Sequence, residues 1–302
     1  MTITFPQHLL SIDDLSLAQI QQVFVVADQA SHAKSADLSP KHQVVANLFF
    51  ENSTRTRCSF EIAAKKIGAE VMNFDFQTSS IHKGETWLDT VDNLQAMGVN
   101  YFVIRHREEE FPFKVARHLG ERASVINAGN GSQEHPTQAL LDAYTLSRHF
   151  SDFAQLKIAI VGDIRHSRVA HSNVKLLTKL GVKDIRLVGP ASLLPTATTV
   201  HCEQNLLAGI EGVDVVMMLR IQKERIDTLD LDDAAYHADY GLTVDKLRSA
   251  DPKALVMHPG PINRGLELTS EVADGPQSII LEQVRNGVFI RMAVLKLLKN
   301  TF

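Results

Sequence analysis

The chain has 302 residues, of which 44% are hydrophobic and 22% are charged, a balance typical of a folded globular protein with about two domains. This composition excludes a disordered chain, a collagen-like fibre and a coiled-coil rod. The 31 Lys and Arg residues are offset by 35 Asp and Glu residues, so we expect no general attraction to nucleic acid or to an anionic membrane. Any bound anion must therefore be held by a local cluster of residues.

The first half of the chain alternates apolar runs of strand length with helical segments. A first helix is predicted over Leu15–Ala33, with Ser16 as its N-cap. Strands are predicted over Gln43–Phe50, Glu70–Phe76, Asn100–Arg105 and Ala123–Asn127. The helices that follow these strands are predicted over Ser53–Ile67, Glu85–Met97, Phe113–Leu119 and Thr137–His149.

The same alternation begins again in the second half. Strands are predicted over Lys157–Val161, Asp184–Val188, Val213–Leu219 and Ala254–Met257, with a helix over Ser167–Leu180. A long last helix is predicted over Gln277–Lys299. Its apolar residues recur at intervals of three and four and form one stripe, which comprises Leu281, Val284, Val288, Met292, Leu295 and Leu298.

Short apolar strands that alternate with helices are typical of parallel sheets covered on both faces. Two such runs predict an α/β fold with two doubly wound parallel-sheet domains that meet near residues 145–155. In sheets of this kind, ligands bind beyond the carboxyl ends of the strands. The residues directly after each strand are therefore the candidate site.

Cysteine usage and the chain start give three further expectations. Cys58 and Cys202 are far apart in the sequence and belong to no metal-ligand spacing, so we expect two core residues and neither a disulfide nor a metal. No basic segment followed by an apolar one opens the chain, and no apolar run reaches the roughly 20 residues that span a bilayer. These patterns predict a cytoplasmic protein that does not contact a membrane.

Hydroxyl and guanidinium groups open the helix after the first strand, in the run Ser53-Thr54-Arg55-Thr56-Arg57. The start of a helix offers free N–H groups and the positive end of its dipole, and an arginine fork fits phosphate oxygens. The alternative is a simple N-cap with solvated arginines. Because two cations in a first turn oppose the dipole, the pattern favours a bound phosphate.

Two more strand ends of the first half carry polar groups. Arg105 closes the third strand, and the fourth is followed by a glycine-bearing loop with His135 and Gln138. These two residues are three positions apart, so they can face one site, although a structural role for His135 is the alternative. The polar segment 79–86 has, from its pattern alone, the composition of a mobile surface loop.

In the second half, Arg168 and Arg220 lie shortly after strands. Gly162 also follows a strand, but the G-x-G-x-x-G spacing of a dinucleotide site is absent. The segment His258-Pro259-Gly260-Pro261 predicts a stiff loop with few N–H groups, whose carbonyls could accept hydrogen bonds from a substrate NH₂ group.

Four motifs together resemble the aspartate/ornithine carbamoyltransferase family in both order and spacing. They are S-T-R-T-R at 53–57, H-P-T-Q at 135–138, R-x-Q-x-E-R at 220–225 and H-P-G-P at 258–261. The resemblance covers essentially the whole chain. H-P-T-Q with R-x-Q-x-E-R is similar to the aspartate-specific branch, whereas ornithine-specific members carry a Ser-Met-Gly motif and an H-C-L-P motif. Here Pro259 and Gly260 replace that cysteine and leucine.

The resemblance implies transfer of the carbamoyl group of carbamoyl phosphate to the α-amino group of L-aspartate, with release of phosphate, in de novo pyrimidine (UMP) biosynthesis. It implies no cofactor. It also implies a carbamoyl phosphate-binding domain over 1–148 and an aspartate-binding domain over 149–302, joined by interdomain helices, with the last helix (about 277–302) packed back on the first domain. Another amine acceptor such as ornithine, or a non-catalytic anion-binding regulator, is the alternative.

The family's pattern also assigns roles to single residues. The phosphate would be held by Ser53, Thr54, Arg55, Thr56 and Arg105. The expected catalytic residues are Arg55, Thr56, Arg105 and His135. The last three would also reach the carbonyl oxygen. Gln138, with the backbone of Gly260 and Pro261, would hold the carbamoyl NH₂ group. L-aspartate would be bound by Lys83, Arg168, Arg220 and Gln222.

The family's pattern finally implies a homotrimer with shared active sites. Ser79 and Lys83 would enter the site from a neighbouring subunit, which replaces the interpretation of segment 79–86 as a plain surface loop. Regulatory or dihydroorotase-like chains are candidate partners of the trimer.

Overall fold

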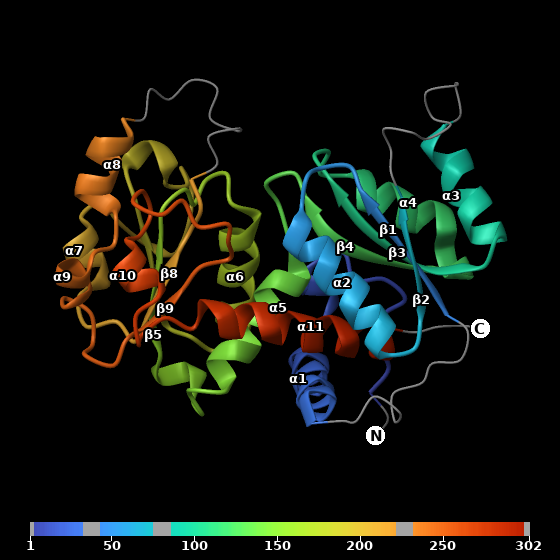
Figure 1. Ribbon diagram of the computed structural model, residues 1–302, viewed down its shortest axis with the longest axis horizontal. Coiled ribbons are helices and arrows are strands. Elements are labelled where there is room, and N and C mark those ends of the chain that lie inside the picture. Colours follow the sequence, from blue (N-terminus) through green and yellow to red (C-terminus); the bar gives the residue numbers. More distant parts are fainter. Residues whose placement is uncertain (1–2, 33–42, 75–85, 222–231, 299–302) are drawn as a thin grey trace. The chain divides into compact units, whose positions relative to one another are not determined.

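The computed structural model describes residues 3–32, 43–74, 86–221 and 232–298. Contacts divide the chain into unit 1, with residues 1–144 and 285–302, and unit 2, with residues 145–284. Both divisions fall inside helices, namely α5 (Pro136–Ser147) and α11 (Ile280–Leu297) (Figure 1).

Within the described residues, unit 1 has four parallel strands, β1 (Val44–Phe49), β2 (Glu70–Phe74), β3 (Val99–His106) and β4 (Ser124–Asn130). They lie in the order β2-β1-β3-β4. The helices that precede or follow them are α1 (Leu17–His32), α2 (Thr54–Lys66), α3 (Trp87–Ala96) and α4 (Phe111–Leu119).

The side chains of alternate residues in these strands point to opposite faces of the sheet. Ala46, Leu48, Phe102 and Ile104 belong to one buried cluster with α3 and α4. Tyr101 points to the other face, where its hydroxyl donates to the carbonyl of Leu295 in α11 at 2.8 Å. Because both faces are covered, β1 and β3 are apolar almost without interruption, which is why the sequence shows them clearly.

In the described part of unit 2 there are five parallel strands, β5 (Lys157–Val161), β6 (Asp184–Val188), β7 (His201–Glu203), β8 (Val215–Met218) and β9 (Leu255–Met257). They lie in the order β7-β6-β5-β8-β9. Its helices are α6 (Arg168–Lys179), α7 (Leu206–Ile210), α8 (Asp233–Tyr240), α9 (Val244–Leu247) and α10 (Ser270–Ala273). Ala159 and Val216 belong to the buried cluster on one face of this sheet, and Ile160 and Met217 to the cluster on the other. The predicted α/β fold with two parallel sheets is therefore confirmed.

The predicted helix ends are also confirmed where hydrogen bonds define them. Ser16 caps α1, because its hydroxyl accepts from the N–H of Gln19 at 3.3 Å, and the Gln19 side chain accepts from the N–H of Ser16 at 2.6 Å. Gly68 and Gly98 follow α2 and α3 with φ angles of +80° and +99°, the left-handed conformation that ends helices.

The prediction of one apolar stripe along the last helix is wrong. Leu281 is 83% exposed and Val284 is 47% exposed, whereas Met292, Leu295 and Leu298 are buried. At the start of α11 the buried residues are Ile280 and Gln283, and farther along almost every residue from 290 to 295 is buried. A helix that is divided between two units packs against different surroundings along its length, so a single stripe does not describe it.

The prediction that both cysteines are core residues is also wrong. Cys58 is exposed on α2, and Cys202 is half-buried in β7. Neither forms a disulfide. Among the helices of the described residues, none is long and apolar enough to cross a membrane.

The contrast along α11 predicts a difference in stability. Leu295→Ala removes a fully buried side chain and should lower the free energy of unfolding by about 2–5 kcal/mol. Leu281→Ala, the matched change on the exposed turn, should alter it by less than about 0.5 kcal/mol. Urea denaturation of both variants measures this difference, and equal losses would show that Leu281 is buried.

Candidate functional site

The order of the strands in unit 1 reverses between β1 and β3, and this is where the predicted phosphate residues lie. β1 and β3 are adjacent parallel strands, with Phe49 opposite Arg105. The N–H of Phe50 donates to the carbonyl of Arg105 at 2.9 Å and extends the pairing by one step. The run Ser53–Arg57 starts immediately beyond this point, so it lies at the same sheet edge as Arg105.

Ser53 occupies the N-cap position of α2, but its side chain makes no capping hydrogen bond. No acidic residue lies in the first turn, whereas Arg55 and Arg57 do. Thr56 is buried and its neighbours Thr54 and Arg55 are exposed. The N-cap side chain of α2 therefore accepts no hydrogen bond from the first turn, unlike Ser167, the N-cap residue of α6.

Arg105 is held in place by an acidic residue that the sequence did not single out. Its Nε lies 3.4 Å from Glu51 Oε2, and its NH1 group donates to the carbonyl of Ala128 at 3.4 Å. Glu51 is the second residue after β1, so the pairing of β1 with β3 brings the two side chains to the same edge. The sequence did contain a signal for this pair: Glu51 follows the first predicted strand, and Arg105 ends the third predicted strand.

His135 ends the loop between β4 and α5, Gln138 lies in the first turn of α5, and an amide network joins the end of β4 to this loop. Asn127 Nδ2 donates to Asn130 Oδ1 at 2.8 Å, and the same oxygen accepts from the N–H of Glu134 at 3.1 Å. Gly129 has a φ angle of +122°, a conformation that favours glycine. His135 and Gln138 are both buried, and the N–H of Gln138 donates to the carbonyl of His135. The structure thus holds both residues rigidly at the start of α5.

Unit 2 repeats this arrangement between β5 and β8, where its strand order reverses. The N–H of Leu219 donates to the carbonyl of Val161 at 2.8 Å, so the ends of β5 and β8 lie side by side. Arg220 comes next after Leu219. Arg168 is the first residue of α6, is buried, and follows Ser167, whose hydroxyl caps the helix through the N–H of Ala170.

A buried carboxylate ties the segment after β8 to the loop after β9. Glu267 Oε1 accepts from the N–H of Ile221 at 3.0 Å and from Asn263 Nδ2 at 2.6 Å. Its Oε2 accepts from the N–H of Asn263 at 2.7 Å and lies 3.7 Å from His258 Nε2. Ile221 is the neighbour of Arg220, so Glu267 fixes the backbone beside that arginine. The sequence patterns did not single out Glu267.

The loop after β9 contains a hydrogen bond between its own residues. The N–H of Gly260 donates to His258 Nδ1 at 2.8 Å, and the peptide bond between Gly260 and Pro261 is cis. Gly260 has a φ angle of +67°, which glycine adopts without strain. Glycine at this position therefore suits the conformation of the loop.

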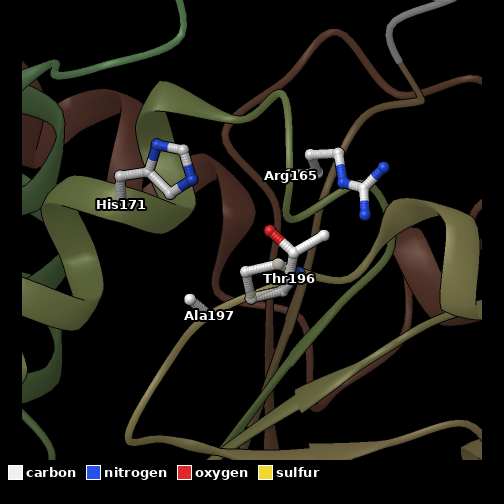
Figure 2. A pocket seen from close by; sticks show the side chains of 5 residues that line it. Arg165, His171, Thr196 and Ala197 are labelled. Atoms are coloured by element: carbon white, nitrogen blue, oxygen red, sulfur yellow. The ribbon is translucent and has the colours of Figure 1, made fainter.

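A separate open hollow lies on unit 2 and is lined by Arg165, His171, Pro195, Thr196 and Ala197. Figure 2 shows the side chains of Arg165 and His171 on either side of Thr196. None of the lining residues is one to which the motifs assign a substrate contact.

Three predicted site residues, Ser79, Lys83 and Gln222, lie outside the described residues. Within the described part of the chain, no group of three or more His, Cys, Asp or Glu side chains could hold a metal ion. The structure brings Ser53–Thr56, Arg105, His135 and Gln138 to unit 1, and it brings Arg168, Arg220, Gly260 and Pro261 to unit 2.

Comparison with known proteins finds similarity in both units. The profile described as the aspartate/ornithine carbamoyltransferase carbamoyl-P binding domain matches residues 7–148, and that of the Asp/Orn binding domain matches residues 154–298. The chain is 32% identical to aspartate transcarbamoylase from Trypanosoma cruzi in complex with carbamoyl aspartate and phosphate, over 97% of this chain and 96% of that one, with a TM-score of 0.87. For that enzyme in complex with N-(phosphonacetyl)-L-aspartic acid, the identity is 31%, the coverage 97% and 96%, and the TM-score 0.85. Ornithine carbamoyltransferase from Gloeobacter violaceus is 27% identical over 98% of this chain and 99% of that one, with a TM-score of 0.81.

The missing cap hydrogen bond predicts that Ser53 contributes little to stability. Ser53→Ala should change the free energy of unfolding by less than about 0.5 kcal/mol. Thr86→Ala should cost about 1 kcal/mol, because the Thr86 hydroxyl accepts from the N–H of Asp89 at 3.2 Å and caps α3. Chemical denaturation compares the two variants. A loss for Ser53→Ala as large as that for Thr86→Ala would identify Ser53 as a structural cap.

Proposed function

We propose a reaction for this chain on the premise that it belongs to the aspartate/ornithine carbamoyltransferase family. It transfers the carbamoyl group of carbamoyl phosphate to the α-amino group of L-aspartate and releases phosphate. The product is N-carbamoyl-L-aspartate, an intermediate of de novo pyrimidine biosynthesis. One observation carries the proposal: the arginine-rich motifs lie beyond the paired strands at which the strand order reverses, once in each unit.

Unit 1 binds carbamoyl phosphate in this proposal. The first turn of α2 presents backbone N–H groups and the positive end of the helix dipole, and hydroxyl and guanidinium groups are added by Ser53, Thr54, Arg55 and Thr56. Arg105 lies at the same sheet edge, where it contributes a further guanidinium group. The match of residues 7–148 to a carbamoyl-P binding domain supports this assignment.

The chemistry requires donors at two places. Carbamoyl phosphate is already activated, so the protein must mainly align the aspartate amine with the carbonyl carbon, an effect worth about 7–11 kcal/mol. Negative charge then develops on the carbonyl oxygen, where each donor contributes about 2.7–4 kcal/mol. We assign Thr56, Arg105 and His135 to that oxygen, and Arg55 to the departing phosphate.

The carbamoyl NH₂ group needs acceptors instead. The Gln138 amide oxygen and the backbone carbonyls of the Gly260–Pro261 loop are acceptors of the required kind. The hydrogen bond from the N–H of Gly260 to His258 supports the assignment, because it helps to define the backbone of the loop that carries these carbonyls.

Unit 2 binds L-aspartate through Arg168, Arg220 and Gln222. Aspartate carries two carboxylates, each of which fits the fork of one arginine. Ornithine carries an ammonium group on its side chain, and an acidic partner would be expected where this chain has an arginine. The similarity to aspartate transcarbamoylases, whose solved complexes hold carbamoyl aspartate and phosphate, supports aspartate over ornithine.

Assembly and location stay predictions. We propose a homotrimer in the cytoplasm, in which Ser79 and Lys83 of one subunit complete the site of the next and Lys83 also contacts L-aspartate. Regulatory or dihydroorotase-like chains are candidate additional partners. The family's mode of sharing sites between subunits is the basis of this proposal.

The choice of acceptor is tested with purified protein. Phosphate release from carbamoyl phosphate should require L-aspartate and should be at least about a hundredfold slower with ornithine, because one carboxylate partner is replaced by an ammonium group. Arg55→Ala is the control for the site and should abolish most of the turnover. Faster release with ornithine than with aspartate would contradict the choice of acceptor, and normal turnover in Arg55→Ala would contradict the phosphate site.

Shared sites are tested by mixing two inactive variants. Arg55→Ala and Lys83→Ala damage different parts of the proposed site, so hybrid trimers contain some sites that carry neither change. We expect activity to return after subunit exchange, and native mass spectrometry confirms that hybrids form. Hybrids without activity would show that Lys83 acts within its own chain.

A further inference from the structure

The Gln138 side chain makes one hydrogen bond within the described residues, and its partner is a buried carboxylate one helical turn later. Gln138 Nε2 donates to Asp142 Oδ1 at 2.9 Å. Asp142 is 1% exposed and Gln138 is 8% exposed, so water competes little for this contact. The spacing of four residues along α5 places the two side chains on the same face of the helix.

The chemistry of the pair leaves Gln138 one orientation. An ionised carboxylate only accepts hydrogen bonds, so Gln138 must turn its NH₂ end toward Asp142. The amide oxygen, on the opposite branch of the planar group, then points away from Asp142 and is left as an acceptor. If Asp142 were replaced by a residue that can also donate, either end of the amide could face it.

A second buried group places a positive charge near Asp142. The Arg291 side chain is buried in unit 1, donates to the carbonyl of Gly287 at 2.9 Å and lies 5.0 Å from the ring centre of Phe60. Burial lowers the pKa of Arg291 to about 10, and the negative charge of Asp142 opposes that lowering. Arg291 therefore stays cationic at neutral pH and compensates the carboxylate in a site with little water.

The close packing at Gly287 shows that this arrangement is tight. A Cβ atom at Gly287 would lie 2.6 Å from Arg291 NH1 and 3.0 Å from Leu141 Cδ2. A side chain at position 287 would therefore displace the end of the Arg291 or the Leu141 side chain. The Arg291 guanidinium group and the side chain of Leu141, the neighbour of Asp142 on α5, thus both lie close to Gly287.

We propose that Asp142 is a positioning residue that fixes the amide of Gln138 with its oxygen toward the substrate. The proposal rests on the proposed function, in which Gln138 holds the carbamoyl NH₂ group. Asp142 then sets a specificity: the site prefers an acyl phosphate with NH₂ on its carbonyl carbon over one with CH₃, because only the NH₂ group donates to the fixed oxygen.

The alternative is that Asp142 only neutralises Arg291. Loss of the carboxylate would then disturb the packing of unit 1 and weaken the binding of every acyl phosphate alike. Acetyl phosphate separates the two cases, because it has the same phosphate and carbonyl groups as carbamoyl phosphate but a methyl group in place of NH₂.

The test compares Asp142→Asn with the wild-type protein in two measurements. An asparagine can donate or accept, so it no longer fixes the Gln138 amide. We expect kcat/KM for carbamoyl phosphate to fall about tenfold, the equivalent of one hydrogen bond. The inhibition constant of acetyl phosphate, measured as a competitor of carbamoyl phosphate, should change by less than about twofold, because its methyl group makes no hydrogen bond to Gln138.

Two further variants guard against a general loss of structure. Glu134→Gln changes another buried carboxylate of unit 1, which accepts from the hydroxyl of Ser11 at 2.6 Å, whereas the Gln138 side chain donates to Asp142. This variant should change kcat/KM for carbamoyl phosphate and the inhibition constant of acetyl phosphate by the same factor. The double variant Asp142→Asn/Arg291→Met removes both buried charges, so it avoids an uncompensated guanidinium group and should still show the selective loss.

The proposal would be overturned if Asp142→Asn weakened the use of carbamoyl phosphate and the binding of acetyl phosphate by the same factor. It would also be overturned if the double variant kept the normal preference for carbamoyl phosphate. If Asp142→Asn does not fold, the double variant decides the question by the same two measurements. These results differ from a failure of the proposed function, in which the wild-type protein itself would release no phosphate from carbamoyl phosphate and aspartate.

Discussion

The parallel pairing of β1 with β3, and of β5 with β8, is the constraint on which the rest of the site depends. In each sheet the strand order reverses at that pair, so the connections leave toward opposite sides and the two strand ends stay uncovered. The backbone hydrogen bonds that follow each pair, from Phe50 to Arg105 and from Leu219 to Val161, hold those ends together. An arginine lies at or just beyond the end of β3 and of β8, and the helices α2 and α6 begin close by.

Two arginines of unit 1 lie close to carboxylates of the protein itself. Glu51 pairs with Arg105, and Asp142 compensates Arg291. Such charges are costly to bury unless they are paired and hydrogen-bonded, and removing one partner leaves the other exposed to the full desolvation cost. Glu267 serves the backbone instead, because it accepts from the N–H groups of Ile221 and Asn263 and joins two loops. The carboxylates therefore determine where the positive groups and loops lie.

The sequence predicted the strands of unit 1 well because both faces of that sheet are covered and the strands are long apolar runs. It missed β7, a strand of three residues that is only half-buried and has no apolar run. It misjudged α11, because periodicity identifies an apolar face but not which neighbour covers each turn. Glu51, Asp142 and Glu267 were missed because their roles depend on partners that the fold brings close. The roles of Ser79, Lys83 and Gln222 come only from the resemblance, since those residues lie outside the described part of the chain.

The pair of Asp142 and Arg291 links the orientation of the Gln138 amide to the two helices that pass between the units. Asp142 lies on α5 shortly before the chain passes from unit 1 to unit 2, and Arg291 lies on α11 shortly after it returns. The two helices that belong to both units thus meet electrostatically inside unit 1, one helical turn from Gln138. An amide is almost symmetric in shape, so packing alone does not distinguish its oxygen from its nitrogen, whereas a buried carboxylate does. The orientation of a single side chain at the site therefore depends on the helices that also connect the two units.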